Sequence, residues 1–433
     1  MKRFVLSGRR CLPVDGAAAF EGPARLAVLD DLPAAVVAAL DAPLDAPPLA
    51  ELARGAHDVA VVVPDATRDC PVADLLPFVV EHLEQAGVRD DQVCVVVGCG
   101  LHRTTTPAEK AELVGAPLAP RLRVVDAQGI SQTSVALGRT TQGGDIWMNE
   151  VVAGADLVVA LGIVEPHLYA GFSGGTKAVA VGCAGQETIA WTHHPAFLDQ
   201  PAVRLCRLDG NPFQEALREI AAATALRFAV NVVLSDGGGV AGVAAGDPAA
   251  AQRRLACDHD GAWIRRHPEP FDLVVAGVPA PKDRSLYQAS RAATYVGLAA
   301  HPVVTPGGLI VCCADLPLGV GDGPGETNFG ALLAATERPL DLVTRGCVEP
   351  LGPGGQRAYM MAKLMTLYRV GVVGGGDRRL IESMGLLAFD CVDEAIAAAR
   401  RTRGPEARVL AVADGLDTIV ELADRARNEV TPA

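Results

Sequence analysis

The sequence predicts an α/β fold made of two domains with mostly parallel sheets. Its 433 residues exceed what one hydrophobic core usually serves, so two domains are the first expectation. Short runs rich in valine recur along the chain, and each is bounded by turn residues and followed by a helical pattern, as in parallel strands joined by crossover helices. Abundant alanine, glycine and valine and a low aromatic content suit such a layered fold.

The first domain is predicted to contain three such strands and a closing hairpin. The strands are VAVVV (59–63), VCVVV (93–97) and DLVVALGIV (156–164). Residues 228–247 then form two strand patterns around a glycine-rich turn, which is typical of a hairpin. A helix and a connector follow, and a fresh strand begins at Phe271. We therefore place the boundary near Pro268 and Glu269 and assign residues 1–268 to the first domain.

The second domain, residues 269–433, repeats the alternation of strands and helices. Its predicted strands are DLVVAGV (272–278), GLIVCC (308–313), RVGVVGG (369–375) and ARVLAVADG (407–415). Near the end of the chain, the pattern of residues 417–430 predicts a last helix. This pattern leaves open whether the helix packs on the second domain or back on the first.

Composition and charge exclude several classes of partner. The formal net charge is −13 without a basic cluster, which argues against nucleic acid as a partner, because Lys and Arg must neutralise its phosphates. The basic N-terminal stretch lacks the apolar core of a signal peptide, and Asp156 interrupts the longest apolar run before it reaches membrane-spanning length. The 11 cysteines are scattered and form no CxxC pair, so we expect a cytoplasmic protein with reduced, mostly buried thiols.

Polar clusters follow the three strands of the first domain. In open α/β sheets, ligands bind in the crevice beyond the carboxyl ends of the strands. The loop after the first strand, PDATRDCP, carries Asp65, Thr67 and Arg68 between two prolines, and its arginine can present a planar fork to a carboxylate or phosphate. Taken alone, this loop is more typical of a solvated surface turn.

The loop after the second strand, GCGLHRTTTPAEK, places His102 just before a helix. Arg103 replaces the third glycine of a dinucleotide fingerprint, so the segment does not support a Rossmann site. Thr106 as N-cap, Pro107 at the first helical position and Glu109 as capping-box partner predict that the helix starts here. A single loop histidine is by itself more often incidental than catalytic.

The loop after the third strand, EPHLYAGFSGGTK, holds His167 and Lys177. It has the glycines and the lysine of a phosphate loop, but Thr176 stands where the second glycine of a Walker A loop belongs, and Ala178 follows the lysine. The small residues predict room for a bulky ligand against the backbone, with N–H groups available to anionic oxygens. A glycine-rich turn with a solvated lysine is the alternative, and this loop alone favours neither.

A short helix follows this loop, with His193 and His194 at its tip. Neutral imidazole is a good ligand for nickel, zinc or copper. One histidine makes no metal site, however, and neither an HExxH motif nor a Cys/His spacing accompanies it. If a metal binds here, something other than the protein must supply its remaining ligands.

Together these features predict one ligand site, because all of them fall at strand ends that should share one crevice. Two histidines that face each other across a small substrate can act as alternating acid and base, and such symmetry suits inversion of a stereocentre. For a 2-hydroxy acid, removal of the α-proton would create a doubly charged enolate. Removal of hydride avoids that charge but requires a hydride acceptor.

With these segments in place, the chain resembles the nickel-pincer lactate racemase family. The resemblance rests on His193 and on the segments PDxTR (64–68), GLHR (100–103), EPHxxAGFSGGxK (165–177), YQxxR (287–291) and GGQRAY (354–359). It implies two α/β domains around an interdomain cleft. It also implies a cofactor, the nickel-pincer nucleotide, which is a nickel complex of a pyridinium bisthiocarboxylate mononucleotide, and hence a need for the enzymes that make this cofactor.

The resemblance implies chemical roles for four residues. Lys177 corresponds to the lysine that can tether the cofactor covalently, and His193 corresponds to the protein ligand of nickel. His102 and His167 correspond to the paired acid/base histidines, one of which takes the hydroxyl proton as hydride leaves C2 for the pyridinium ring. The implied activity is that of an isomerase, a racemase or epimerase of a 2-hydroxy acid.

The resemblance also implies binding roles. Asp65, Thr67 and Arg68 correspond to a loop that holds cofactor and substrate, and Gln288 comes from the second domain to complete the cleft. The chain departs from the family where YQASR replaces the usual YQxxK, so that Arg291 stands in place of a lysine that contacts substrate. The wider fork of arginine would suit a second carboxylate or a different chain length.

A second departure is Val181, which stands where many relatives have proline, four residues after the tethering lysine. Two other functions stay open from the residues. One is a relative that binds the cofactor but catalyses a different hydride-shuttle redox reaction, and the other is a non-catalytic binding protein for a sugar acid or nucleotide. Paired acid/base histidines favour an enzyme, because binding alone does not require them.

Overall fold

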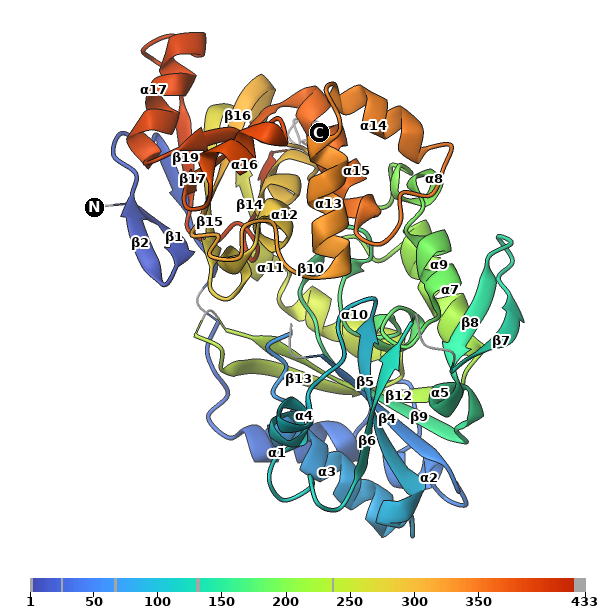
Figure 1. Ribbon diagram of the computed structural model, residues 1–433. Coiled ribbons are helices and arrows are strands. Elements are labelled where there is room, and N and C mark those ends of the chain that lie inside the picture. The colour runs from blue at the N-terminus through green and yellow to red at the C-terminus, as the bar shows by residue number, and fades with distance from the viewer. Residues whose placement is uncertain (1–2, 25, 66–67, 130–132, 236, 424–433) are drawn as a thin grey trace, which may run out of the picture. The chain divides into compact units, whose positions relative to one another are not determined.

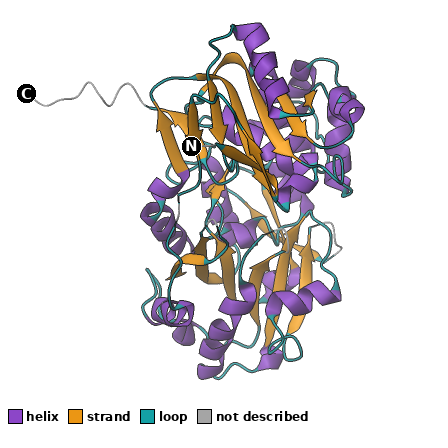
Figure 2. Ribbon diagram, turned by 90° about the vertical axis from the view of Figure 1, so that its left-hand side faces the viewer, coloured by secondary structure: helices purple, strands orange, loops and turns teal. Residues whose placement is uncertain are grey.

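The computed structural model of the chain describes residues 3–24, 26–65, 68–129, 133–235 and 237–423. The chain folds into two compact units (Figure 1). One unit, called the middle unit below, spans Arg25–His259, and the other, the split unit, combines Met1–Ala24 with Asp260–Ala433. Helices accompany the strands in both units (Figure 2), and most strand pairs are parallel, so the predicted α/β class is confirmed.

The middle unit is built on a six-stranded sheet in the order β13-β12-β9-β4-β5-β6. All neighbours in it are parallel except β12 and β13, which form the predicted hairpin. Its strands are β4 (Val59–Pro64), β5 (Val93–Gly100), β6 (Arg123–Gln128), β9 (Leu157–Ile163), β12 (Leu226–Leu234) and β13 (Val240–Gly246). Two small hairpins pair β7 (Ser134–Arg139) with β8 (Asp145–Asn149) and β10 (Pro166–His167) with β11 (Gly171–Phe172).

Helices cover this sheet because its strands bury side chains on both faces. Alternate valines of β4, namely Val59, Val61 and Val63, pack in one core cluster with side chains of α1 and α3. The helices of the unit are α1 (Leu32–Asp41), α2 (Leu49–Leu52), α3 (Val72–Gln85), the 3-10 turn η1 (Asp90–Gln92), α4 (Pro107–Val114), α5 (Glu150–Gly154), α6 (Lys177–Ala180), α7 (Gln186–Thr192), α8 (Pro195–Leu198), α9 (Pro212–Ala222) and α10 (Pro248–Asp258). The predicted capping box at the start of α4 is confirmed.

The split unit is built on an eight-stranded sheet in which β15 is central. One edge of β15 pairs with β16, and the other is shared by β19 along its first half and by β1 near its end. The strands of the unit are β1 (Phe4–Gly8), β2 (Arg10–Pro13), β3 (Ala19–Glu21), β14 (Ile264–His267), β15 (Phe271–Pro279), β16 (Val304–Ala314), β17 (Arg369–Gly374), β18 (Leu387–Phe389), β19 (Val409–Val412) and β20 (Ile419–Leu422).

The two faces of this sheet are packed differently. Helices α12 and α15 contribute to the larger core cluster, and α17 covers a smaller one. The helices are α11 (Asp260–Trp263), the 3-10 turn η2 (Lys282–Arg284), α12 (Leu286–Gly297), α13 (Pro324–Ala334), α14 (Pro339–Gly346), α15 (Gly355–Leu367), α16 (Arg378–Ser383) and α17 (Val392–Arg403).

The middle unit begins and ends at different residues from the first predicted domain, residues 1–268. Residues 1–24 belong with the C-terminal half because β1 pairs in parallel with β15 and β3 pairs with β19. The boundary after the hairpin lies at His259 rather than near Pro268, because β14 already belongs to the split unit.

The predicted last helix is replaced in part by a strand. Ile419–Leu422 forms β20, which pairs in parallel with β14, and the β-branched side chains of Ile419 and Val420 are buried there. Residues 424–430 of the predicted helix lie outside the described residues.

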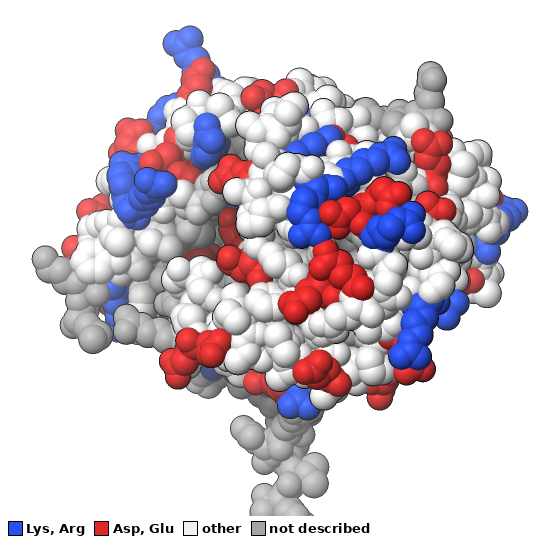
Figure 3. All heavy atoms as spheres, turned by 90° about the horizontal axis from the view of Figure 1, so that it is seen from below, with Lys and Arg blue, Asp and Glu red and all other residues white. Residues whose placement is uncertain are grey.

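On the face shown in Figure 3, acidic and basic side chains are interspersed. Within the residues that the structure describes, no helix is long and apolar enough to cross a membrane.

Candidate functional site

The three predicted loops emerge from neighbouring strands of the middle unit. Strands β9, β4 and β5 lie side by side and run parallel. Asp65 follows β4 directly, His102 follows β5, and His167 lies shortly after β9 in β10. Because the carboxyl ends of parallel strands meet at one edge of a sheet, the topology brings these side chains to the same edge.

Asp65 orients the imidazole of His102. The Oδ2 atom of Asp65 lies 2.7 Å from the Nδ1 atom of His102, and the side chains are 9% and 47% exposed, respectively. An ionised carboxylate can only accept hydrogen bonds, so Nδ1 of His102 carries a proton. In the neutral ring the lone pair is then on Nε2, and the contact with Asp65 fixes the orientation of the ring.

The same loop also reaches the segment that carries His167. The guanidinium of Arg68 forms an ion pair with the carboxylate of Glu165, and both side chains are largely buried. Glu165 is tied to the glycine-rich segment as well, because its N–H donates to Ser173 Oγ at 3.1 Å. Thr67, the third predicted residue of this loop, lies outside the described residues.

The Nδ1 atom of His167 accepts hydrogen bonds, whereas that of His102 donates one. His167 lies in the tight hairpin of β10 and β11, where its Nδ1 atom accepts hydrogen bonds from the N–H groups of Tyr169 and Ala170 at 3.3 and 3.2 Å. Backbone N–H groups only donate, so Nδ1 of His167 is an acceptor and the neutral ring carries its proton on Nε2. Of the two predicted acid/base histidines, one therefore presents a basic Nε2 atom and the other an Nε2–H donor.

His193 has the arrangement of a metal-binding histidine. It caps the end of α7, and its Nδ1 atom lies 2.9 Å from the carbonyl oxygen of Ile189, so Nδ1 donates and Nε2 keeps its lone pair. Histidines that bind metals commonly donate their other N–H to a carbonyl in this way. The neighbouring His194 has a different task, because its Nδ1 atom accepts from Ala196 N at 3.2 Å and caps α8.

An aromatic cluster connects His193 with His167. The ring of Tyr169 makes edge contacts with both imidazoles, with centroid distances of 5.6 Å to each. Phe213 packs against both His193 and Tyr169, at centroid distances of 5.2 and 5.8 Å. Among the described residues, no group of three or more His, Cys, Asp or Glu side chains could hold a metal ion.

The glycines before Lys177 serve packing rather than an open platform. Residues 171–176 are buried, and Gly171 and Gly175 have φ angles of 77° and 55°. A Cβ atom on Gly171 would lie 1.9 Å from the carbonyl oxygen of Arg207, and one on Gly175 would lie 2.9 Å from that of Pro248. The expected room for a ligand against these glycines is therefore filled by protein.

The packed glycine segment fixes the position of Lys177, the first residue of α6. Gln252 Nε2 donates to the carbonyl of Ser173 at 2.9 Å, and Asn231 Oδ1 accepts from Gly175 N at 3.2 Å. Lys177 itself is only partly buried. Beside it, the hydroxyl of Thr176 is buried and has no hydrogen-bond partner among the described residues, which makes it available to a group bound at Lys177.

Helix α6 is docked against the end of β5. Gly100 N donates to the carbonyl of Gly182 at 2.9 Å, and a Cβ atom on Gly98 would lie only 3.2 Å from Gly182 Cα. Val181 ends the helix at a φ of −119° and donates its N–H to the carbonyl of Lys177 at 3.1 Å. Proline has neither that φ nor an N–H. Proline therefore does not fit the local backbone at this departure from the family.

The cysteines of the site are not nucleophiles. Burial raises the pKa of the Cys99 thiol, at the end of β5, to about 12, and it also raises the pKa of Cys183 well above its ordinary value. A thiol with such a pKa stays protonated at neutral pH and is unreactive. These two residues are buried as the sequence predicts, but four of the 11 cysteines are buried in all, so the prediction that most of the thiols are buried is wrong.

Gln288 and Arg291 belong to the split unit, on α12. The backbone N–H of Gln288 donates to Ser285 Oγ at the start of the helix. Arg291 is 9% exposed, and its guanidinium donates to the hydroxyl of Tyr295 at 2.9 Å. The guanidinium of Arg291, which stands where the family usually has the lysine of YQxxK, is thus held in a fixed position.

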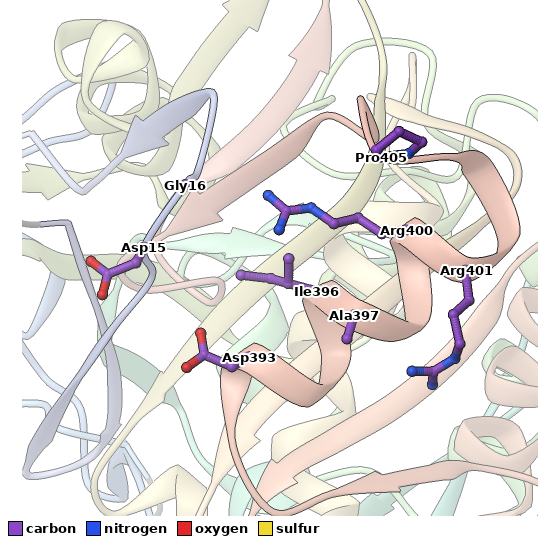
Figure 4. A pocket seen from close by; sticks show the side chains of 8 residues that line it. All are labelled: Asp15, Gly16, Asp393, Ile396, Ala397, Arg400, Arg401 and Pro405. Carbon is purple, nitrogen blue, oxygen red and sulfur yellow. The ribbon is translucent and has the colours of Figure 1, made fainter.

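An open pocket in the split unit lies apart from these residues (Figure 4). It is lined by Asp15 and Gly16 and by one face of α17, where Asp393 and Arg400 bring charges of both signs. None of the predicted site residues lines this pocket. The candidate site is therefore formed by the loops that follow β4, β5 and β9 of the middle unit.

Sequence reasoning missed two parts of the site. Glu165 was not predicted as a site residue, and its position directly before Pro166 and His167 was the available signal. Asp65 was predicted to hold cofactor and substrate, and its pairing with His102, 37 positions away in the sequence, was not predicted. No local pattern links those two residues.

Comparisons with known proteins agree with these observations. The lactate racemase N-terminal domain family matches residues 18–205, and the lactate racemase C-terminal domain family matches residues 268–420. A lactate racemase of Lactiplantibacillus plantarum is 30% identical over 88% of this chain and 89% of its own length. A lactate racemase of Thermoanaerobacterium thermosaccharolyticum is 26% identical over the same shares.

The fold is also shared with a solved structure. The lactate racemase apoprotein from Thermoanaerobacterium thermosaccharolyticum superposes with a TM-score of 0.88 at 22% identity, covering 97% of this chain and 100% of that one.

Proposed function

Because the chain belongs to the lactate racemase family of isomerases, we propose that it is a racemase or epimerase that inverts C2 of a 2-hydroxy acid by reversible hydride transfer. The observation that carries this proposal is the opposite hydrogen bonding of Nδ1 in two histidines at one sheet edge. His102 presents a basic Nε2 atom, and His167 presents an Nε2–H group. Inversion of a stereocentre needs such a pair, whereas simple binding does not.

The residues present fit a nickel-pincer nucleotide. His193 offers one imidazole Nε2 atom with a supporting hydrogen bond, and among the described residues no group of three or more His, Cys, Asp or Glu side chains could hold a metal by itself. This suits a metal whose other ligands belong to its organic partner. We propose that His193 binds the nickel, that Lys177 tethers the organic part, and that Asp65, Thr67 and Arg68 border it. When bound, this group would supply the acceptor for the hydride from C2.

The protein's own part is proton transfer and positioning. His102 accepts the hydroxyl proton at Nε2, and the carboxylate of Asp65 stabilises the imidazolium that results. His167 donates a hydrogen bond from Nε2 to the substrate oxygen. For the mirror-image substrate the roles exchange, so the ring of His167 must change tautomer: Nε2 gives up its proton, Nδ1 takes one up, and the hydrogen bonds from Tyr169 and Ala170 are lost.

Substrate binding is proposed to rest on cationic and amide groups. Arg68 is anchored by Glu165, so that its charge stays near the histidines, and it is proposed to hold the carboxylate of the substrate. Gln288 and Arg291 are assigned to substrate on the family resemblance. The enzymes that make the cofactor are the partners that the proposal requires.

The experiment uses protein produced together with the cofactor-making enzymes. Single enantiomers of several 2-hydroxy acids are incubated with the wild type and with His102→Gln and His167→Gln, and products are separated by chiral chromatography. Both variants should lose conversion in both directions, because each direction needs both rings. His194→Gln is the matched control and should convert normally.

The outcomes separate the open alternatives. Normal conversion by either histidine variant would refute the two-base scheme. Accumulation of the 2-keto acid without the mirror-image product would favour a hydride-shuttle redox enzyme. Binding of a sugar acid without any conversion would favour a binding protein.

A further inference from the structure

Tyr169, in the middle unit, contacts two imidazoles that have different proposed tasks. Its ring centroid lies 5.6 Å from that of His167 and 5.6 Å from that of His193, and the ring planes cross at 76° and 86°. Aromatic rings prefer such edge-to-face contacts to face-to-face stacking. The side chain of Tyr169 therefore joins the proposed acid/base residue in β10 to the proposed nickel ligand at the end of α7.

The ring of Tyr169 belongs to a closed set of three rings. Phe213, in α9, lies 5.2 Å from His193 and 5.8 Å from Tyr169, so each of the three rings contacts the other two. Phe213 is fully buried, and Tyr169 is 6% exposed. Because protein interiors are close-packed, none of these rings can turn without moving its neighbours. The hydrogen bond from Nδ1 of His193 to Ile189 fixes one edge of that imidazole, and the two aromatic rings fix its tilt.

Polar contacts hold the backbone of Tyr169 in the same place. Its N–H donates to Nδ1 of His167 at 3.3 Å, so Tyr169 contacts that imidazole through both its backbone and its ring. Its carbonyl oxygen accepts from Nδ2 of Asn211 at 2.8 Å. Asn211 is fully buried, and its Oδ1 atom accepts from Phe213 N at 3.0 Å at the start of α9. One buried amide therefore ties Tyr169 to the helix that carries Phe213.

Two groups that act on one substrate must keep a fixed separation. Functional groups have to be held within about 0.5 Å of their productive positions, and a displacement of about 1 Å can lower a rate about 100-fold. A side chain that contacts both imidazoles keeps their separation constant.

We propose that Tyr169 is a positioning residue that fixes the imidazole of His193 relative to the imidazole of His167. This inference rests on the proposed function for the tasks of the two histidines. The packing of the ring carries the effect, so phenylalanine should be able to replace Tyr169, whereas leucine should not.

The first experiment measures whether the two imidazoles are coupled, and it requires neither cofactor nor substrate. Full-length protein is isotopically labelled at its nine histidines, and the imidazole signals are recorded by NMR. His193→Gln removes one of the two imidazoles. The change that it causes in the signals of His167, which are assigned with His167→Gln, is compared in the wild-type, Tyr169→Phe and Tyr169→Leu backgrounds.

His193→Gln should shift the His167 signals in the wild-type and Tyr169→Phe backgrounds, because the ring at position 169 moves when its neighbour is removed. In the Tyr169→Leu background the His167 signals should stay where they are. An equal shift in all three backgrounds, or a shift in none of them, would overturn the proposal.

The second experiment relates the ring to the reaction of the cofactor-loaded protein. We measure kcat and KM for both enantiomers of a 2-hydroxy acid, together with the absorption spectrum of the bound nickel. Phe197→Leu is the matched control, because Phe197 is also 6% exposed. Within the described part of the chain, its ring contacts are with Trp191 and Phe213 rather than with an imidazole.

For Tyr169→Leu we expect kcat to fall about 10- to 100-fold in both directions, KM to change less than about 3-fold, and the nickel absorption bands to shift. Tyr169→Phe and Phe197→Leu should keep kcat within about 3-fold of the wild type and should keep its spectrum. Equal losses in Tyr169→Leu and Phe197→Leu would overturn the proposal, because they would show a general effect of a cavity. Equal losses in Tyr169→Phe and Tyr169→Leu would overturn it by assigning the effect to the hydroxyl, and an unchanged kcat in Tyr169→Leu would overturn it as well.

The two experiments keep this inference separate from the proposed function. A wild-type protein that interconverts no 2-hydroxy acid would refute the proposed function, while the NMR comparison would still decide whether Tyr169 couples the two imidazoles.

Discussion

The hydrogen bond between Asp65 and His102 offers the sharpest test of the acid/base assignment. Asp65→Asn keeps the shape of the side chain but removes its charge. The amide can also turn its NH₂ group toward Nδ1 of His102, which moves the ring proton to Nε2 and removes the basic lone pair. Because the Oδ2–Nδ1 distance is 2.7 Å and Asp65 is 9% exposed, little water is available to replace the carboxylate.

The size of the effect follows from the lost charge. Two unit charges about 4 Å apart interact by about 4 kcal/mol at an effective dielectric constant of about 20. The His102 side chain is 47% exposed, so we take about half of that value, ~2 kcal/mol, for the loss of imidazolium stabilisation. This corresponds to roughly a 30-fold loss of rate. If the wrong tautomer dominates, the loss approaches the ~10⁴-fold effect of the same change in a Ser-His-Asp triad.

The assay is conversion of one enantiomer of a 2-hydroxy acid, followed by chiral chromatography, with cofactor-loaded Asp65→Asn. Asp69→Asn, an exposed aspartate in the same loop, is the control and should keep full activity. Nickel content should be unchanged in both variants if Asp65 acts through His102. A loss below about 10-fold in Asp65→Asn would refute the reasoning, and a loss of nickel would show that Asp65 holds the cofactor.

Two further predictions concern the cofactor and the stability of the split unit. His193→Ala should lose bound nickel, measured by elemental analysis, while His194→Ala should keep it. Nickel retained by His193→Ala would show that this residue is not the ligand. Lys177→Ala should lose any covalent adduct in intact-mass spectra. Burial raises the pKa of Asp414 to about 7 from 3.8, so its contribution to stability is present below about pH 4 and is lost as pH rises through about 7. Asp414→Asn keeps an acceptor oxygen for Leu416 N but cannot ionise. The free energy of unfolding of this variant, relative to that of the wild type, should therefore rise between pH 4 and pH 8 by at most roughly 4 kcal/mol. A difference that denaturant unfolding shows to be independent of pH would contradict this.

Local sequence signals predicted the elements that depend on local physics. Runs such as VAVVV became buried parallel strands because β-branched side chains suit strands that are covered on both faces. Thr106, Pro107 and Glu109 started a helix where the capping pattern predicted one, since all its hydrogen bonds are local.

Features that depend on distant partners were not predictable in the same way. The pairing of β1 with β15 joins residues about 270 positions apart, and β20 becomes a strand only because β14 provides a partner. The glycines around Gly171 gave an ambiguous signal, because the same small residues suit a ligand platform or close packing against Arg207. Only the fold decides between those uses.

In the candidate site, residue types were predictable but pairings were not. Both histidines follow strands, so the strand-end rule indicated their shared location. Their opposite tautomers depend on Asp65 and on the N–H groups of Tyr169 and Ala170, which only the folded loops bring into reach.

The most direct test of the proposed hydride transfer is the fate of the hydrogen on C2. A single enantiomer of a 2-hydroxy acid, deuterated at C2, is incubated in ordinary water with the cofactor-loaded enzyme, and the mirror-image product is analysed by chiral chromatography with mass spectrometry. If the hydrogen leaves and returns as hydride without contact with solvent, the product should retain deuterium at C2. A mirror-image product with solvent hydrogen at C2 would contradict the account, because it would show removal of a proton instead.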